Sequence, residues 1–460
     1  MWYHTAITFV TGRGELARQL MVAEWPLMKR RAEARRGRAL LAAGLLSASV
    51  YLALAGRLSW WRYGQTLGSW AQLLGEEPAA WGVCLGGIGV LAALYVWGLR
   101  CVRTGDARRR TIWAFAFVSA AALVWLMPIT SDLFAYLSHA HMVTDLGANP
   151  LWQAPRDFRD PILLAYRTVY AARPAMYGPV WILLSAPGTV GLYDIPVGLF
   201  YLKGLVAVAY LGSAWLVERI LLELRPEVAL EGLYLFAWSP FVLFMAVGDG
   251  HNDIAMMALV LLALWLLRRE RWMLAFGVLA LSVWTKYVSL VLLPLFLIYA
   301  WRRQEEGKRW ALPRPAAQGG LAMALVSLLM VVPLGGPEGL LGIAQRLLHP
   351  LNWRSGASGM PTVILGAGLS LFALVYAVLV MRFWRGSGTF QQLTNAGFLA
   401  MLLAFFLGAA RSQPWHLLWG AALAGLSNYR WAQPVIVGLS ILMLAVQVGV
   451  EWAVPTGLSR

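Results

Sequence analysis

Residues 231–267 read EGLYLFAWSPFVLFMAVGDGHNDIAMMALVLLALWLL, and this stretch decides the fold. Two apolar runs, 231–247 and 252–267, meet at the polar turn GDGHND. Neither run shows the alternation of a half-buried strand, and each approaches the roughly 20 apolar residues that a membrane-spanning helix needs. The stretch therefore predicts a hairpin of two membrane helices with a polar tip.

Similar apolar runs occur along most of the chain. Beyond this hairpin the candidate spans are 39–57, 80–99, 111–129, 196–217, 272–285, 287–301, 317–334, 361–381, 394–410, 413–427 and 433–452. About thirteen spans are therefore expected, and all should be helical because lipid offers backbone groups no other partner. The predicted fold class is an all-α polytopic membrane bundle.

The composition agrees with this fold class. Of the 460 residues, 60% are hydrophobic and 13% are charged. Soluble domains are roughly 45–50% apolar and about 25% charged, so a soluble chain is excluded, and a disordered chain is excluded by the low charge. The two cysteines, Cys84 and Cys101, form no C-x-x-C motif and indicate neither a redox nor a zinc site.

Basic residues set the expected orientation. They gather in short segments such as KRRAEARRGR (29–38) and RCVRTGDARRR (100–110), which the alternation of spans places on one side. By the positive-inside rule that side is the cytoplasm, and the N-terminus lies there. The net charge of +16 records this bias, so we expect no nucleic-acid partner.

The orientation divides the chain into two parts. Residues 1–37 are predicted to form a cytoplasmic amphipathic helix whose polybasic end binds anionic membrane lipid, the alternative being an unstructured tail. Residues 38–460 are predicted to form a single domain of an integral cytoplasmic-membrane protein. Its longest outer loop, 130–195, is expected to carry juxtamembrane helices, one of them near 180–193.

Polar residues concentrate at the outer ends of the predicted spans. Five of the six histidines and seven of the eight aspartates fall there. Ionisable groups close to the apolar region are costly and mark functional sites. Their convergence at one face favours an extracytoplasmic active site over a translocation path, although a transporter or flippase stays open as an alternative.

The first polar cluster is Thr130-Ser131-Asp132, where the third span ends. Tyr136 and His139 follow Asp132 at helical spacing, on one face. The alternative role of Asp132 is that of a helix cap, because Ser131 and Asp132 are both good capping residues.

The second cluster is the turn GDGHND at 248–253. Asp249, His251 and Asp253 are more than a turn requires, so we interpret them as functional. These side chains are possible ligands for a divalent metal, but three residues in one turn do not fix a site. We expect no metal and leave the possibility open.

Two further clusters lie at the outer ends of later hairpins. Lys286, in WTKY, can either snorkel to water or hold a phosphate. Arg411, Gln413 and His416, in RSQPWH, form either a second polar patch or an interfacial anchor of Arg and Trp. Together these clusters offer one acid and several cations. Such a set can deprotonate a hydroxyl with the acid and stabilise a phosphate leaving group with the cations.

At these residues the sequence resembles the GT-C superfamily of membrane glycosyltransferases, and most closely its polyprenyl-phosphate-mannose-dependent mannosyltransferases. The likeness rests on SDLFAYLSHAHMVTDLGANP, on YGPVW (177–181), on AWSPFVLFMAVGDGHNDIAMMALVLLALWLL, on RWMLAFGVLALSVWTKYVSLVLLPL and on SQPWHLLW. The resemblance implies a helical bundle with a large first outer loop. It also implies inverting transfer of a sugar, in this case a mannosyl group, from a polyprenyl-phosphate donor to a hydroxyl of a glycan or glycolipid acceptor.

The resemblance assigns roles to residues of this chain. It implies that Asp132 is the general base. The implied ligands of the donor phosphate are Lys286, His251 and Arg411, and the implied substrate-binding residues are Tyr136, His139, Tyr177, Asp249, Asn252, Asp253, Gln413 and His416. Members of the family often carry Arg or Lys one or two turns after the aspartate, where this chain has His139 and His141. A glycan polymerase or ligase with a diphosphate-linked donor is a related alternative.

Overall fold

The computed structural model describes most of the chain. The described residues are 37–60, 78–104, 108–165, 171–191, 195–303, 314–332, 341, 362–408 and 413–453. The predicted N-terminal amphipathic helix, up to residue 36, and the predicted phosphate ligand Arg411 lie outside these ranges.

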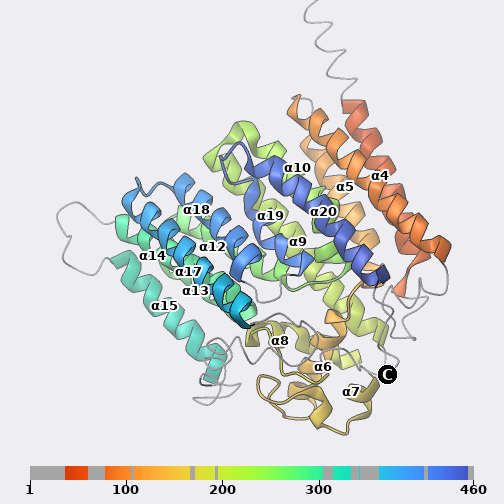
Figure 1. The fold of residues 1–460 in the computed structure, drawn as a ribbon, viewed down its shortest axis with the longest axis horizontal. Coiled ribbons are helices and arrows are strands. Elements are labelled where there is room, and N and C mark those ends of the chain that lie inside the picture. The colour runs from red at the N-terminus through yellow and green to blue at the C-terminus, as the bar shows by residue number, and fades with distance from the viewer. Residues whose placement is uncertain are drawn as a thin grey trace, which may run out of the picture.

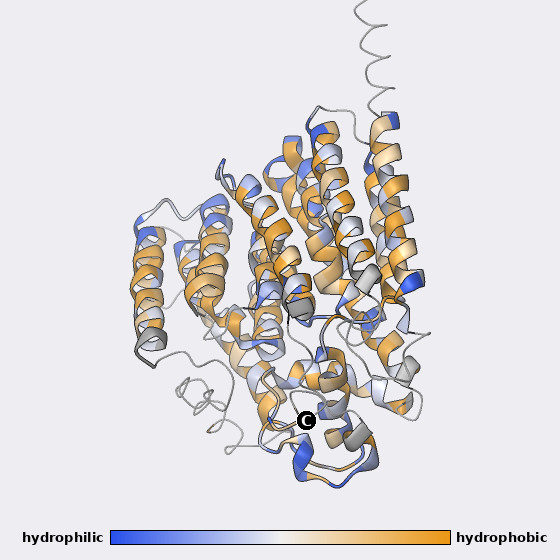
Figure 2. Cartoon of the chain, turned by 45° about the vertical axis from the view of Figure 1, so that its right-hand side comes forward, coloured by the Kyte–Doolittle hydropathy of each residue, from blue (hydrophilic) through white to orange (hydrophobic). Residues whose placement is uncertain are grey.

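The described residues form an all-α bundle, as the apolar runs predicted, with one isolated bridge between Ser59 and Leu126 (Figure 1). The long helices are Gly37–Arg57, α4 (Pro78–Arg103), α5 (Arg109–Val124), α9 (Ile195–Leu224), α12 (Asp253–Arg268), α13 (Trp272–Thr285), α14 (Leu293–Arg302), α15 (Arg314–Val331), α17 (Thr362–Arg385), α18 (Phe390–Leu403) and α20 (Ala432–Ala453). Hydrophobic residues run along these helices and hydrophilic ones gather near their ends (Figure 2).

The expected number of spans is not confirmed. Seven helices in the described ranges are long and apolar enough to cross a membrane, or eight if one bent pair is a single span. The other five predicted spans, from 111–129 to 413–427, fall on shorter helices. A helix of 16 residues, such as α5 or α12, rises only about 24 Å against a hydrocarbon core of roughly 30 Å.

The bent pair is the first arm of the hairpin that decides the fold. It consists of α10 (Ala229–Ala237) and α11 (Pro240–Leu243), with η3 (Pro226–Val228) before them and the π-helix η4 (Phe244–Gly248) after them. The two halves meet at 51° because Pro240 ends the α10 hydrogen-bond pattern and begins a new helix. η4 then delivers the chain to Asp249.

The described part of segment 130–195, which was predicted to be the first outer loop, contains short helices, as expected. α6 (Asp132–Thr144), α7 (Pro161–Ala165) and α8 (Pro179–Ser185) lie together at one end of the bundle (Figure 1). The 3-10 turn η1 (Pro155–Asp157) lies between α6 and α7, and the 3-10 turn η2 (Ala186–Gly191) follows α8 directly.

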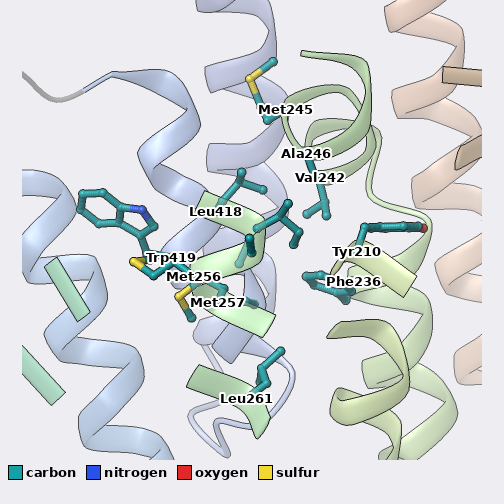
Figure 3. Packing of buried hydrophobic residues seen from close by; sticks show 14 of the residues in the cluster. Tyr210, Phe236, Val242, Met245, Ala246, Met256, Met257, Leu261, Leu418 and Trp419 are labelled. Atoms are coloured by element: carbon teal, nitrogen blue, oxygen red, sulfur yellow. The ribbon is translucent and has the colours of Figure 1, made fainter. Parts of the chain in front are cut away.

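One hydrophobic cluster runs through the bundle from Leu40 to Val448. Part of it is built from α9, α10, α12 and the short helix α19 (Leu418–Ala424), and includes Met256, Met257 and Leu418 (Figure 3). Trp419 belongs to this cluster and also carries a polar contact of the site (Figure 3). The site therefore rests directly on the packed core.

Candidate active site

Asp132 is the first residue of α6. Ser131 is the residue before the helix, and its side chain makes no capping hydrogen bond. The structure therefore shows no side-chain cap by Ser131. A carboxylate in the first turn is favoured by the helix dipole. α6 ends at Thr144, and Gly147 then takes a positive φ of 58°.

The loop 249–252 packs against the start of α6. Gly250 has a φ of 82°, and a Cβ on this residue would lie 2.6 Å from Leu133. Only glycine meets both demands, because other residues rarely adopt this backbone conformation and the side chain would collide with α6. The glycine therefore brings the neighbouring polar residues of the loop to Asp132.

His251 lies between two aspartates. Its Nδ1 is 3.2 Å from Oδ2 of Asp132, and its Nε2 is 2.8 Å from Oδ2 of Asp249. The imidazole and the Asp249 side chain are fully buried, and the Asp132 side chain is 12% exposed. The sequence placed all three residues at one face, and the structure brings them into contact across 119 residues of chain.

The charges around His251 raise its pKa. Burial alone would lower the pKa, but attraction to the Asp249 and Asp132 carboxylates outweighs burial and raises the pKa from 6.5 to about 9. The imidazole is therefore a cation at neutral pH, with each ring nitrogen facing one carboxylate.

Asp249 also ties its loop to the segment before α6. Its Oδ1 accepts hydrogen bonds from the backbone N–H of Thr130 at 2.7 Å and from the Thr130 hydroxyl at 3.2 Å. Because Thr130 lies two residues before Asp132, this link fixes the position from which α6 begins.

Two acceptor oxygens in this cluster have no hydrogen-bond partner within the described residues. They are Oδ1 of Asp132 and Oδ1 of Asn252, and both are buried. Buried polar atoms are nearly always paired, so an unpaired acceptor marks a position for a donor from outside the chain. A substrate hydroxyl has the required chemistry.

Tyr136 links α6 to the loop from one turn further along. Its hydroxyl lies 3.5 Å from Oδ2 of Asp132 and accepts a long hydrogen bond from the N–H of Asn252, at 3.4 Å. Its ring packs edge-on against Tyr177 and Trp181. Tyr136 therefore stands beside the carboxylate, as the helical spacing predicted.

His139 and Tyr177 bind each other. Nδ1 of His139 is 2.5 Å from the Tyr177 hydroxyl, which also donates to the carbonyl of Ala135 at 3.2 Å. Nε2 of His139 faces the carbonyl of Arg173 at 3.2 Å. With both ring nitrogens engaged and the residue 2% exposed, His139 has the environment of a packing residue of α6.

Lys286 belongs to a second cluster. Its ammonium donates to both carboxylate oxygens of Asp253, at 2.8 and 2.7 Å, and lies 5.8 Å from the centre of the Trp419 ring. The Asp253 side chain is fully buried, and the Lys286 side chain is 21% exposed. Gly178 packs close to this hairpin tip, because a Cβ there would lie 2.0 Å from the carbonyl of Trp284.

The segment 413–419 lies against both clusters. Trp415 stacks on His251 at 4.2 Å between ring centres, and His416 stacks on Trp419 at 4.5 Å. The Trp419 indole donates to Oδ1 of Asp253. Gln413 contributes its backbone N–H to Nδ1 of His416, at 3.3 Å.

Sequence reasoning missed the two tryptophans. Trp415 and Trp419 stand in the quoted motif SQPWHLLW, where an interfacial anchor of Arg and Trp was the alternative to a polar patch and neither tryptophan was proposed as a site residue. Their helical spacing with His416 was the available signal: residues 415, 416 and 419 share a face of one turn.

The described residues contain no group of three or more His, Cys, Asp or Glu side chains that could hold a metal ion. Asp132, His251 and Asp249 do not converge on one point, because the imidazole of His251 lies between the two carboxylates. The predicted absence of a metal stays a prediction.

The chain is similar to known mannosyltransferases. It is 24% identical over 188 residues to Alpha-(1->6)-mannopyranosyltransferase A of Corynebacterium glutamicum, which is 40% of this chain and 37% of that relative. The match thus spans about a third of the relative's length. No solved structure matches the chain.

The family model described as "Alpha-(1->6)-mannopyranosyltransferase, N-terminal domain" matches residues 35–303. The matched range includes Asp132, Asp249, His251, Asp253 and Lys286. With more than half of its length matched, the chain belongs to the family of Alpha-(1->6)-mannopyranosyltransferase N-terminal domains.

Proposed function

We propose that the protein transfers a mannosyl group from a polyprenyl-phosphate-linked donor to a hydroxyl of a glycan or glycolipid acceptor. The family and the printed activity of the curated relative support mannosyl transfer. One observation carries the proposal for the site: Asp132 is held by His251 through Oδ2, while its buried Oδ1 has no hydrogen-bond partner among the described residues.

In this proposal Asp132 is the general base. Its Oδ1 accepts the proton of the acceptor hydroxyl while the hydroxyl oxygen attacks the anomeric carbon of the donor. The bond between that carbon and the phosphate oxygen breaks, and polyprenyl phosphate leaves with the bonding electrons. A single displacement inverts the anomeric configuration. A carboxylate suffices because phosphate is already a good leaving group.

Lys286 is the cation that we assign to the donor phosphate. Asp253 fixes its ammonium from the buried side, and the 21% exposure of the side chain leaves it accessible to a ligand. His251 is better suited to positioning Asp132 than to binding phosphate, since both of its ring nitrogens face carboxylates. Arg411 remains a predicted phosphate ligand from its place in the sequence.

Asn252 and Tyr136 are proposed to contact sugar or acceptor hydroxyls. Asn252 offers a buried acceptor oxygen that has no hydrogen-bond partner among the described residues, and Tyr136 stands beside it. The distribution of basic residues supports an extracytoplasmic site with the N-terminus in the cytoplasm. We propose that the cytoplasmic membrane is the location and that no cofactor beyond the lipid-linked donor is required.

A transfer assay tests the proposal. Purified protein in liposomes is supplied with a panel of polyprenyl-phosphate sugars and a mannan acceptor, and the products are analysed by mass spectrometry with and without EDTA. We expect one added hexose from the mannosyl donor and an EDTA-insensitive rate. Movement of lipid-linked sugar across the bilayer without transfer would instead identify a flippase, and use of diphosphate-linked donors alone would identify a polymerase or ligase.

A further inference from the structure

Lys203 is a buried cation that belongs to neither carboxylate cluster. It lies within the apolar helix α9 and is 0% exposed. A charge in such a position is costly unless it is paired, and ionisable residues inside membrane helices are functional candidates. The mechanism proposed above makes no use of it.

The Lys203 ammonium binds the carboxyl-terminal ends of two helices. It donates to the carbonyls of Leu123 and Leu126 at the end of α5, and to those of Val247 and Gly248 at the end of η4. The contacts to Leu123 and Val247 are both 3.3 Å, and the other two are closer.

These carbonyls are the groups that helix ends leave unsatisfied. The last turn of a helix also carries partial negative charge, so two such ends repel each other when they meet. A buried ammonium between them satisfies the carbonyls and removes the repulsion.

Both helix ends lead directly into the site. Gly248 is followed by Asp249, and the segment after Leu126 leads to Thr130, whose N–H binds Oδ1 of Asp249 at 2.7 Å. Asp249 and His251 then reach Asp132 through the contacts already described. The ammonium thus joins the two segments that carry the proposed base and its partner.

We infer that Lys203 is a positioning residue, which holds the ends of α5 and η4 so that Asp132 and His251 keep their reactive geometry. This inference rests on the proposed transfer activity. Lys203 is not itself a group that touches the substrate, because its side chain is fully enclosed and its hydrogen bonds go to backbone carbonyls.

The chain offers a matched control at the other end of α9. Arg109 forms a two-pronged ion pair with the buried Glu218, with Nη2 2.7 Å from Oε2, and so also joins α5 to α9. Glu218 is 15 residues beyond Lys203, about 22 Å along the helix. Loss of this ion pair weakens the packing of α5 against α9 and removes no contact of the site residues.

The experiment compares Lys203→Met with Glu218→Gln in the transfer assay, with rates expressed per folded molecule from unfolding in detergent. We expect Lys203→Met to lower kcat by about 100-fold with little change in the KM for the donor. Glu218→Gln is expected to lower stability and leave kcat near the wild-type value. If Lys203→Met does not fold, Lys203→Gln, which keeps a donor but no charge, is measured by the same criteria.

Two results would overturn the inference while leaving the proposed function intact. One is a wild-type kcat for the folded Lys203 variant. The other is an equal loss of kcat in Lys203→Met and Glu218→Gln, which would show a general effect of weakened packing. Absence of transfer by the wild-type protein would instead overturn the proposed function, and this inference with it.

Discussion

The two carboxylate clusters at the site both use residues of the turn 248–253. They differ in how many hydrogen-bond partners their carboxylate oxygens have. Asp253 is completely paired: Lys286 binds both of its oxygens, and Trp419 adds a third donor. Asp132 shares His251 with Asp249 and keeps one oxygen without a partner in the described residues.

This difference separates a supporting carboxylate from a reactive one. Both oxygens of Asp253 already accept hydrogen bonds from the chain, so in the proposal this carboxylate holds the Lys286 cation in place. An unpaired buried oxygen is costly, typically by about 1–3 kcal/mol, and persists where a ligand completes it. This difference supports the proposal that Asp132 accepts the proton and that Asp253 holds Lys286 in place.

The largest expected effect separates these two roles. Asp132→Asn is expected to lower kcat by about 1,000-fold or more, because the amide cannot accept the hydroxyl proton. Asp253→Asn should raise the donor KM more than it lowers kcat, because Lys286 loses its anchor. Steady-state transfer kinetics give kcat and the donor KM of each variant. Equal losses of kcat in the two variants would contradict the different roles proposed for Asp132 and Asp253.

The ion pair of the second cluster predicts a large effect on stability. Lys286→Met leaves the buried Asp253 carboxylate without its cation and is expected to cost about 3–5 kcal/mol of unfolding free energy. Adding Asp253→Leu removes the stranded charge and should restore most of the loss. Unfolding by titration with a denaturing detergent measures both, and strict additivity of the two substitutions would show that the pair is not coupled.

The first cluster predicts a dependence on pH. The pKa of His251 is raised from 6.5 to about 9, so its cation stabilises the fold fully below pH 6.5. This contribution, roughly 3 kcal/mol, is lost as the pH rises towards 9 and the imidazole releases its proton. Thermal unfolding in detergent should show a falling midpoint over this range.

His251→Gln serves as the control for the pH dependence. Its unfolding midpoint should be lower at neutral pH and nearly flat between pH 6.5 and 9. A variant that retains the full wild-type slope would assign the titration to another group.

The smallest effect concerns Tyr136. Its hydroxyl is 3.5 Å from Oδ2 of Asp132, which is long for a hydrogen bond. Tyr136→Phe should therefore reduce kcat by less than about tenfold, the equivalent of one ordinary hydrogen bond. A loss of kcat as large as that of Asp132→Asn in the same assay would indicate that the Tyr136 hydroxyl takes a direct part in the reaction.

The sequence predicted the class of the fold. The apolar runs indicated an all-helical membrane bundle, and the polar residues of GDGHND and WTKY were proposed as site residues from their position between such runs, which stays a prediction. The number of spans was not confirmed, because apolar composition does not distinguish a full span from a shorter buried helix such as α12.

The pairing within the site required the structure. Asp132 meets His251 across 119 residues and Trp419 meets Asp253 across 166, contacts that no local spacing encodes. For the same reason, sequence reasoning could not distinguish the paired Asp253 from the partly unpaired Asp132. Lys203 stands in an apolar run of the sequence, but no local spacing encodes the helix ends that it binds.

The most direct test of the central claim is an experimental structure of Asp132→Asn with a mannosyl donor and an acceptor bound. The account predicts the acceptor hydroxyl within hydrogen-bond distance of the side-chain atom that replaces Oδ1 of Asp132, with the donor phosphate at Lys286. An acceptor hydroxyl at Asp253 instead, with no ligand atom near residue 132, would contradict it.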